Sequence, residues 1–475
     1  MPPTCRNASV LGISVALFSA PHDSWRAPGV PQFAVADLFR FPTILMQRRE
    51  FLKHSAALAA LPLLRLDPRS APLHVNGDRL NGWLAGFDRI GRTAGGINRV
   101  AYSDADLAGR AYVLEIFQQA GLAPRIDAAG NIHGRIPGSD RSLKPIMIGS
   151  HVDSVTDGGN FDGPVGSFSA LEVARSIRDN NVRLRHPLDV VVWQNEEGGT
   201  IGSKLAIGAL TDADLDKVAR SGRTIREGIG RVGGDVAKLG TAVLVRGDIA
   251  YYLELHIEQG GLLEQAGVQI GVVEGIVGLR WFEITIAGFA NHAGTTPMDQ
   301  RHDAMLAAAK FTVAVNEAVR SEPGRQVATV GRVVVSPNTT NVIPAQVVLT
   351  VDLRDLDAAK LSHFTERFER LGNEIGAATG TTFTFKRLVD SEPALSDARV
   401  MKWIDASATA LGLTRQRMPS GAGHDAQEIA RVAPIGMIFV PSIGGISHSP
   451  RELTRARDVA NGADVLLNAV IAADR

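Results

Sequence analysis

Short apolar runs alternate along this chain with amphipathic stretches, and the spacing of the apolar residues predicts the elements. Residues 188–193 and 251–256 are runs rich in β-branched or aromatic residues, as in buried strands. Apolar residues recur at helical spacing in 104–119 and 167–180. Strands that alternate with helices in this way favour a mixed or parallel sheet covered on both faces. We therefore expect an α/β fold.

The pattern changes between residues 276 and 392. The elements predicted there follow the order strand, helix, strand, strand, helix, strand, at 279–287, 303–319, 325–335, 345–354, 358–378 and 381–388. This βαββαβ order is that of a ferredoxin-like unit. Because the earlier pattern resumes afterwards, this unit is predicted to be inserted into the α/β domain, whose two parts are then residues 76–275 and 393–475.

The first 70 residues are predicted to form a separate N-terminal extension. Residues 46–70 join a basic start, Arg48-Arg49-Glu50-Phe51-Leu52-Lys53, to about eleven small and apolar residues. This layout resembles a twin-arginine export signal, and a bilayer span would need about 20 apolar residues. We expect translation to start at Met46 and the protein to be exported to the periplasm. The alternative is a cytoplasmic protein with a disordered or amphipathic arm.

Composition narrows the kinds of partner and of metal site. The chain has 475 residues, which predicts two or three domains, and its 50 basic residues balance 50 acidic ones. No bulk charge attracts nucleic acid, and no later segment is apolar enough to span a membrane. The single cysteine, Cys5, excludes an internal disulfide and a cysteine-based zinc site. Any metal must therefore be held by histidines and carboxylates.

One glycine-rich loop, residues 147–166, carries residue types that bind divalent metals. It follows an apolar run and contains His151, Asp153 and Asp162, at the strand end where α/β folds place ligand sites. Taken alone, such a loop is more often an ordinary solvated one, and Asp157 is interpreted as a turn residue. Four further stretches with histidine or acidic residues adjoin other predicted strands, at 194–198, 256–260, 420–425 and 444–449. Their convergence at one sheet edge would build a metal cluster.

Together these motifs resemble the zinc-dependent amidohydrolases of the hydantoinase/carbamoylase family, relatives of the M20 metallopeptidases. The resemblance covers about residues 76–475. It implies a metallohydrolase catalytic domain with an inserted lid and dimerisation domain. It also implies two divalent ions per subunit (Zn²⁺, Mn²⁺ or Co²⁺), with Asp162 as the bridging carboxylate. The ligands that it implies are His151, Asp162, Glu197, His256 and His448.

Further roles follow from the resemblance or from position. Asp153 is expected to accept the second ring N–H of His151. Glu196 matches the general base, which takes a proton from the metal-bridging water and delivers it to the departing nitrogen. His292, in the lid motif, would stabilise the oxyanion, in its own subunit or across a homodimer. Residues that match substrate contacts are Gln259, Asn341, Arg354, Gly423 and His424. For Gly423 and His424, positioning of the backbone is an equal alternative.

The activity that this resemblance implies is hydrolysis of the linear C–N amide bond of N-carbamoyl-L-amino acids or similar ureido acids, which are small-molecule substrates. One alternative is an allantoate amidohydrolase, and another is an M20-type exopeptidase or aminoacylase. A binding protein without catalysis would be marked by loss of Glu196 or of a metal ligand, and all are present. The small residues at 199–203 depart from the family's bulkier sequence, which leaves the size of the acyl group open.

Overall fold

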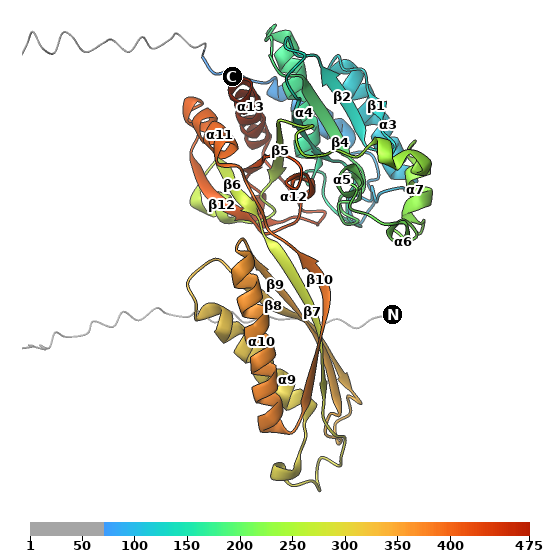
Figure 1. Ribbon diagram of the computed structural model, residues 1–475, viewed down its shortest axis with the longest axis vertical. Coiled ribbons are helices and arrows are strands. Elements are labelled where there is room, and N and C mark those ends of the chain that lie inside the picture. The colour runs from blue at the N-terminus through green and yellow to red at the C-terminus, as the bar shows by residue number, and fades with distance from the viewer. Residues whose placement is uncertain (1–70) are drawn as a thin grey trace, which may run out of the picture. The chain divides into compact units, whose positions relative to one another are not determined.

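The computed structural model describes residues 71–475 (Figure 1). The predicted export signal at 46–70 lies outside the described residues and stays a prediction. Among the described helices, none has the length and apolar character that a bilayer crossing requires.

The α/β part of the chain, outside the inserted unit, is built on a nine-stranded mixed sheet. Its order is β1-β2-β4-β3-β5-β13-β6-β11, and β12 also pairs with β6. The four central strands β4, β3, β5 and β13 run parallel, so their carboxyl ends meet at one edge. The strands are β1 (Arg125–Ile126), β2 (Ile132–Ile136), β3 (Ile146–His151), β4 (Leu188–Trp193), β5 (Tyr251–Ile257), β6 (Ile270–Ile276), β11 (Ala394–Leu395), β12 (Arg415–Ser420) and β13 (Ile435–Val440).

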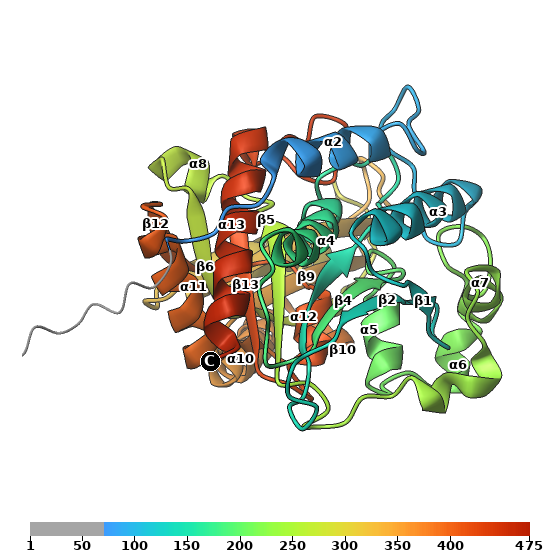
Figure 2. The ribbon, with the colours of Figure 1, turned by 90° about the horizontal axis from the view of Figure 1, so that it is seen from above.

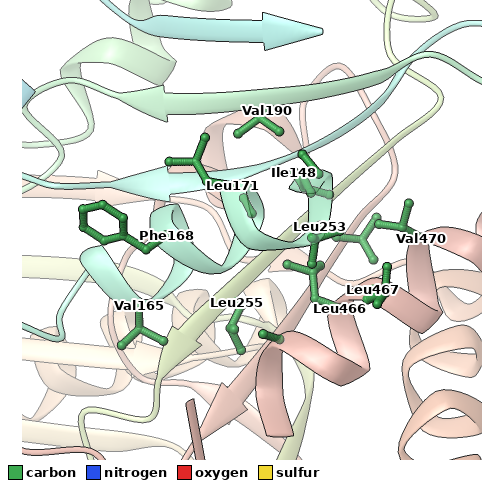
Figure 3. Close-up of a cluster of buried hydrophobic side chains, with 14 of the residues drawn as sticks. Ile148, Val165, Phe168, Leu171, Val190, Leu253, Leu255, Leu466, Leu467 and Val470 are labelled. Carbon is green, nitrogen blue, oxygen red and sulfur yellow. The ribbon is translucent and has the colours of Figure 1, made fainter. Parts of the chain in front are cut away.

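Helices cover both faces of this sheet, as the all-buried central strands require (Figure 2). One apolar core joins the sheet to α2 (Gly77–Phe87), α3 (Asp104–Gln119), α4 (Pro164–Asp179), α11 (Ala398–Ala410) and α13 (Ala456–Ala473). Figure 3 shows its centre, where Phe168 and Leu171 of α4 lie near Ile148 and Val190 of the sheet. A second core on the opposite face includes α5 (Ile201–Ala206) and α12 (Asp425–Ile429).

The inserted unit has the predicted ferredoxin-like order. Its four antiparallel strands lie in the order β10-β7-β9-β8, and the inward residues of β7 and β9 pack against the two helices. The elements are β7 (Gly278–Ala287), α9 (Ala304–Arg320), β8 (Val327–Ser336), β9 (Gln346–Asp355), α10 (Ala358–Thr379) and β10 (Thr382–Ser391). The predicted fold class, an α/β domain with an inserted βαββαβ lid, is therefore confirmed.

Three strands were not predicted, β6, β11 and β12, and β11 has only two residues. Gly271 and Gly275 interrupt the apolar pattern of β6, and β12 is mostly polar. The segment 203–247 forms only short helices. The remaining short elements are α6 (Asp212–Leu215), α7 (Ile225–Arg231), η1 (Val236–Thr241), α8 (Leu262–Ala266), η2 (Met298–Gln300) and η3 (Ile443–Gly445).

Candidate metal centre and active site

The carboxyl ends of the parallel strands carry the candidate residues. β4 and β5 flank β3 on opposite sides, so the end of β3 is the point where the order of strands reverses and ligand sites form. His151 ends β3, and Asp162 lies in the loop between β3 and α4. Glu196 and Glu197 follow β4, and the remaining histidines come from β5 and from the loop after β13. Residues from four segments thus meet at one edge.

Two groups of ligands share the carboxylate of Asp162. Asp162 Oδ1 lies 3.6 Å from His151 Nε2 and 3.3 Å from His256 Nε2. Asp162 Oδ2 lies 3.4 Å from His448 Nε2, which is also 3.3 Å from Glu197 Oε1. All five predicted metal ligands therefore converge. Asp162 directs Oδ1 at one group and Oδ2 at the other.

The chemistry of these donors fits a bound cation. His151 Nδ1 lies 3.2 Å from the backbone carbonyl of Asp153, and His256 Nδ1 lies 3.0 Å from that of Ile257. Each carbonyl accepts a hydrogen bond from the Nδ1–H of its ring, and Nε2 is therefore the atom that each ring directs at Asp162. His151 Nε2 is buried without a hydrogen-bond partner. Although burial lowers the pKa of both rings, nearby carboxylates raise it above the ordinary value, so the site favours positive charge.

Asp153 holds the loop after β4 rather than the histidine ring. Its Oδ1 accepts the backbone N–H of Glu196 and its Oδ2 that of Glu197, each at 3.1 Å. The carboxylate is 3.6 Å from His151 Nδ1, whereas the backbone carbonyl of Asp153 is closer. The expected contact from the Asp153 carboxylate to the ring is therefore replaced by one from its carbonyl. Asp153 orients ligand and base together.

Glu196 is placed as a carboxylate beside the metal ligands but outside both groups. Its Oε2 lies 3.7 Å from His151 Nε2. Burial raises the pKa of Glu196 well above its ordinary value, and Asp425, Glu197 and Asp153 add to this, while His151 opposes it. A carboxyl group with a raised pKa next to a cation site has the properties of a proton carrier.

Gln259 and His424 lie against the ligands themselves. Gln259 Nε2 donates to Asp162 Oδ2 at 2.7 Å. The His424 ring packs edge-on against His256, with centroids 4.5 Å apart, and its Nε2 lies 2.9 Å from Ser420 Oγ. Burial lowers the pKa of His424 well below its ordinary value, which keeps the ring neutral. Both side chains are thus positioned to support the ligands, a role that was not assigned to them.

The lid residues divide into two groups. The hydrogen bonds of exposed His292 stay within the lid, as its Nδ1 accepts from Gly294 N. The backbone carbonyl of Asn341 likewise accepts within the lid motif, from Ala293 N at 3.0 Å. Arg354, by contrast, reaches a loop outside the lid, where it bonds to Gly421. Neither His292 nor Asn341 has a hydrogen bond to the metal ligands among the described residues.

Arg354 is occupied by groups of the chain itself. Its Nε and Nη2 donate to the carboxylate of Asp352, and its Nη1 donates to Gly421 O at 2.6 Å. Gly421 belongs to the loop between β12 and α12, which also contains Gly423. The arginine that was predicted to hold a substrate carboxylate therefore already holds a carboxylate, and it joins the lid to the loop of Gly423.

Three polar residues of the site were not predicted; two of them, Glu254 and Glu452, are buried, and Ser447 is partly buried. Glu254 lies two positions before His256 on β5, and its Oε1 accepts from Ser150 Oγ at 2.9 Å. The period of two on a strand would have found it. Ser447 and Glu452 flank His448 in its own motif, and both bond to the loop of Asp162. A serine and a glutamate in a loop carry no signal of such long-range contacts.

The chain is similar to known proteins over most of its length. Residues 147–472 match the model of "Peptidase family M20/M25/M40". The N-carbamoyl-L-amino acid amidohydrolase of Geobacillus stearothermophilus is 37% identical over 83% of this chain and 98% of its own length. The allantoate amidohydrolase of Escherichia coli is 34% identical, over 81% and 94%. A hydantoinase/carbamoylase family amidase from Burkholderia multivorans has a similar structure, with TM-score 0.78 and 36% identity over 84% and 98%.

Proposed function

This chain belongs to the hydantoinase/carbamoylase amidases of the M20 family, and we propose that it hydrolyses the linear C–N amide bond of N-carbamoyl-L-amino acids or similar ureido acids. The observation that carries the proposal is Asp162, whose two oxygens face two separate histidine-and-carboxylate groups beside the free carboxyl of Glu196. That arrangement suits hydrolysis of an unactivated amide.

We propose that two divalent ions, Zn²⁺, Mn²⁺ or Co²⁺, occupy these groups. His151, Asp162 and His256 would hold one, and Asp162, Glu197 and His448 the other. When bound, such ions lower the pKa of water and polarise a carbonyl. No cysteine is available in either group, and this imidazole and carboxylate set is typical of these metals.

The chain's own residues then supply proton transfer and orientation. Glu196 receives the proton of the attacking water and returns it to the departing nitrogen, which its position beside His151 Nε2 permits. Arg354 and Asn341 hold the carboxylate of the substrate, for which the planar guanidinium is suited. Arg354 has to exchange the carboxylate of Asp352 for that of the substrate, or share it.

A substrate panel tests the reaction. Purified protein, loaded with Zn²⁺, Mn²⁺ or Co²⁺, is assayed for ammonia and amino acid release from N-carbamoyl-L-amino acids, ureidoglycolate, allantoate and dipeptides. Turnover of several N-carbamoyl-L-amino acids supports the proposal. Turnover of allantoate alone would instead indicate an allantoate amidohydrolase, the second candidate function. The similarity to the allantoate amidohydrolase of Escherichia coli supports this candidate. Cleavage of dipeptides without turnover of ureido acids would overturn both.

We also propose a homodimer that forms through the lid. β8 is an edge strand of the lid sheet, and its Val327, Val333 and Val334 are exposed. Apolar edge strands of this length pair with another chain unless they are covered. In such a dimer, His292 would serve the partner's site. Mixing His292→Ala with Glu196→Gln subunits should then restore part of the activity, because one site of each mixed dimer is intact. A protein that is monomeric in solution would contradict the proposal.

Export by the twin-arginine route is proposed from the segment 46–70 alone. Fusing residues 46–75 to a reporter that matures in the cytoplasm before export tests it. Reporter in the periplasm supports the proposal, and a matched Arg48→Lys, Arg49→Lys fusion should stay in the cytoplasm. A cytoplasmic wild-type fusion would refute it.

A further inference from the structure

Glu452 joins two metal-ligand loops that lie about 290 positions apart in the sequence. Its Oε1 accepts the backbone N–H of Phe161 at 2.8 Å and that of Asp162 at 3.0 Å. Its Oε2 accepts the backbone N–H of His448 at 3.2 Å and lies 2.9 Å from Ser447 Oγ. The carboxylate thus uses one oxygen for each loop.

Burial and close packing hold the carboxylate of Glu452 in place. Glu452 is 6% exposed, and its side chain packs against Gly159, where an added Cβ would clash with Glu452 Cβ. Ser447 Oγ also lies 2.6 Å from Asp162 Oδ2, so its single proton serves either this oxygen or Glu452. Glu452 thus bonds to the backbone of the two loops and to Ser447, and none of these bonds is to Glu196 or to the side chain of a metal ligand.

The loop of His448 needs such support. His448 has a positive φ of 53°, which a residue with a side chain adopts at a conformational cost. Half of its side chain is exposed, so packing alone does not hold the ring. The bond from its N–H to Glu452 fixes the turn that directs Nε2 at Asp162 and Glu197.

We propose that Glu452 is a positioning residue that determines the affinity of the ion held by Asp162, Glu197 and His448. It fixes the backbone of two of that ion's three ligands, but of only one in the group of His151, Asp162 and His256. Its loss should therefore affect the two ions unequally. This inference rests on the proposed two-metal site.

The test measures metal binding directly. Metal-free wild-type protein and Glu452→Gln are titrated with Zn²⁺ by calorimetry, and the bound metal is counted after dialysis. A glutamine has one carbonyl oxygen for donors on both sides, so one loop loses its acceptor. We expect one ion to bind about 10–100-fold more weakly, as for other residues that orient ligands, and the second ion to change less. Activity is recorded but does not decide the result.

A second variant and a control separate positioning from general damage. Gly159→Ala displaces Glu452 without altering its charge and should weaken the same ion. Glu172→Gln is the control, because Glu172 is a fully buried carboxylate that accepts from Asn76, Arg79 and Ser176 and from no metal ligand. It should lower the melting temperature and leave both affinities unchanged.

The identity of the weakened ion is tested by combination. Glu452→Gln added to His448→Ala should leave the affinity of the remaining ion almost unchanged. Added to His256→Asn, it should weaken the remaining ion by about the same 10–100-fold. Two ions bound with unchanged affinity by Glu452→Gln would overturn the positioning role. If wild-type protein itself binds no ion, the proposed function fails instead, and the two failures are distinguishable.

Discussion

Asp162 Oδ1 and His256 Nε2 face each other at 3.3 Å, although the ring's other nitrogen already has an acceptor in the carbonyl of Ile257. A cation between the two atoms satisfies both. We therefore expect removal of metal by a chelator to lower the melting temperature, since an ion that binds only the folded state stabilises it by about 2.7 kcal/mol at a hundred times its Kd. Thermal unfolding with and without added Zn²⁺ measures this, and Asp162→Asn should show no metal response.

Glu196→Gln should abolish turnover while it preserves the site. The amide keeps the shape of the side chain but cannot accept a proton, and general acid–base groups contribute roughly 10²–10⁴-fold to rate. Steady-state kinetics should show the loss in kcat. Metal content is the control, because Glu196 lies outside both ligand groups. A variant that retains more than about a tenth of wild-type kcat would remove Glu196 from the mechanism.

Asp153→Asn should impair both catalysis and metal binding. Asp153 accepts two neighbouring N–H groups with two oxygens, and an asparagine has only one oxygen to offer. The loop of Glu196 and Glu197 then shifts, and we expect a loss of about 10–100-fold in metal affinity or activity. Asp157→Asn is the matched control in the same loop, since Asp157 is an exposed residue that bonds to Asn98. Equal behaviour of the two variants would contradict the assignment.

Arg354→Lys should raise KM for ureido acids with little change in kcat. A lysine lacks the planar fork that binds a carboxylate by two bonds, and hydrogen bonds to charged groups contribute about 1.5–3 kcal/mol, which corresponds to roughly 10–150-fold in KM. Asp352→Asn should have the opposite effect, because it removes the carboxylate that occupies Arg354. Arg332→Lys, at an exposed position on β8, is the control. An unchanged KM in Arg354→Lys would exclude it from substrate binding.

Asp106 should make stability depend on pH in a defined direction. Burial raises its pKa from 3.8 to about 6, a change that Arg110 only partly offsets. The folded state therefore holds this proton more tightly than the unfolded chain, and its contribution to stability is lost as pH rises from about 4 to 6. A pKa shift of about two units corresponds to a change of about 3 kcal/mol in the free energy of unfolding. The melting temperature of wild type relative to Asp106→Asn should fall over that range, and parallel profiles would contradict the assignment.

The main elements of the fold and most residues of the site could be predicted from the sequence, because local sequence patterns encode local structure. The period of apolar residues located the central strands, and the order of elements identified the ferredoxin-like lid. Parallel strands place their carboxyl ends at one edge, so His151, Glu197 and His256 could be assigned to one site before any coordinates. Their residue types then specified imidazole and carboxylate ligation.

Tertiary structure decided which atom meets which partner. Asp153 was expected on the ring of His151, yet its carboxylate lies on the backbone of Glu196 and Glu197. Glu452 likewise accepts a hydrogen bond from Asp162, 290 positions away, and Arg354 donates one to Gly421, 67 positions away. Periodicity reports which side of an element is buried, but a hydrogen bond depends on the packing of segments that are remote in sequence. That packing alone determined which residues orient the metal ligands.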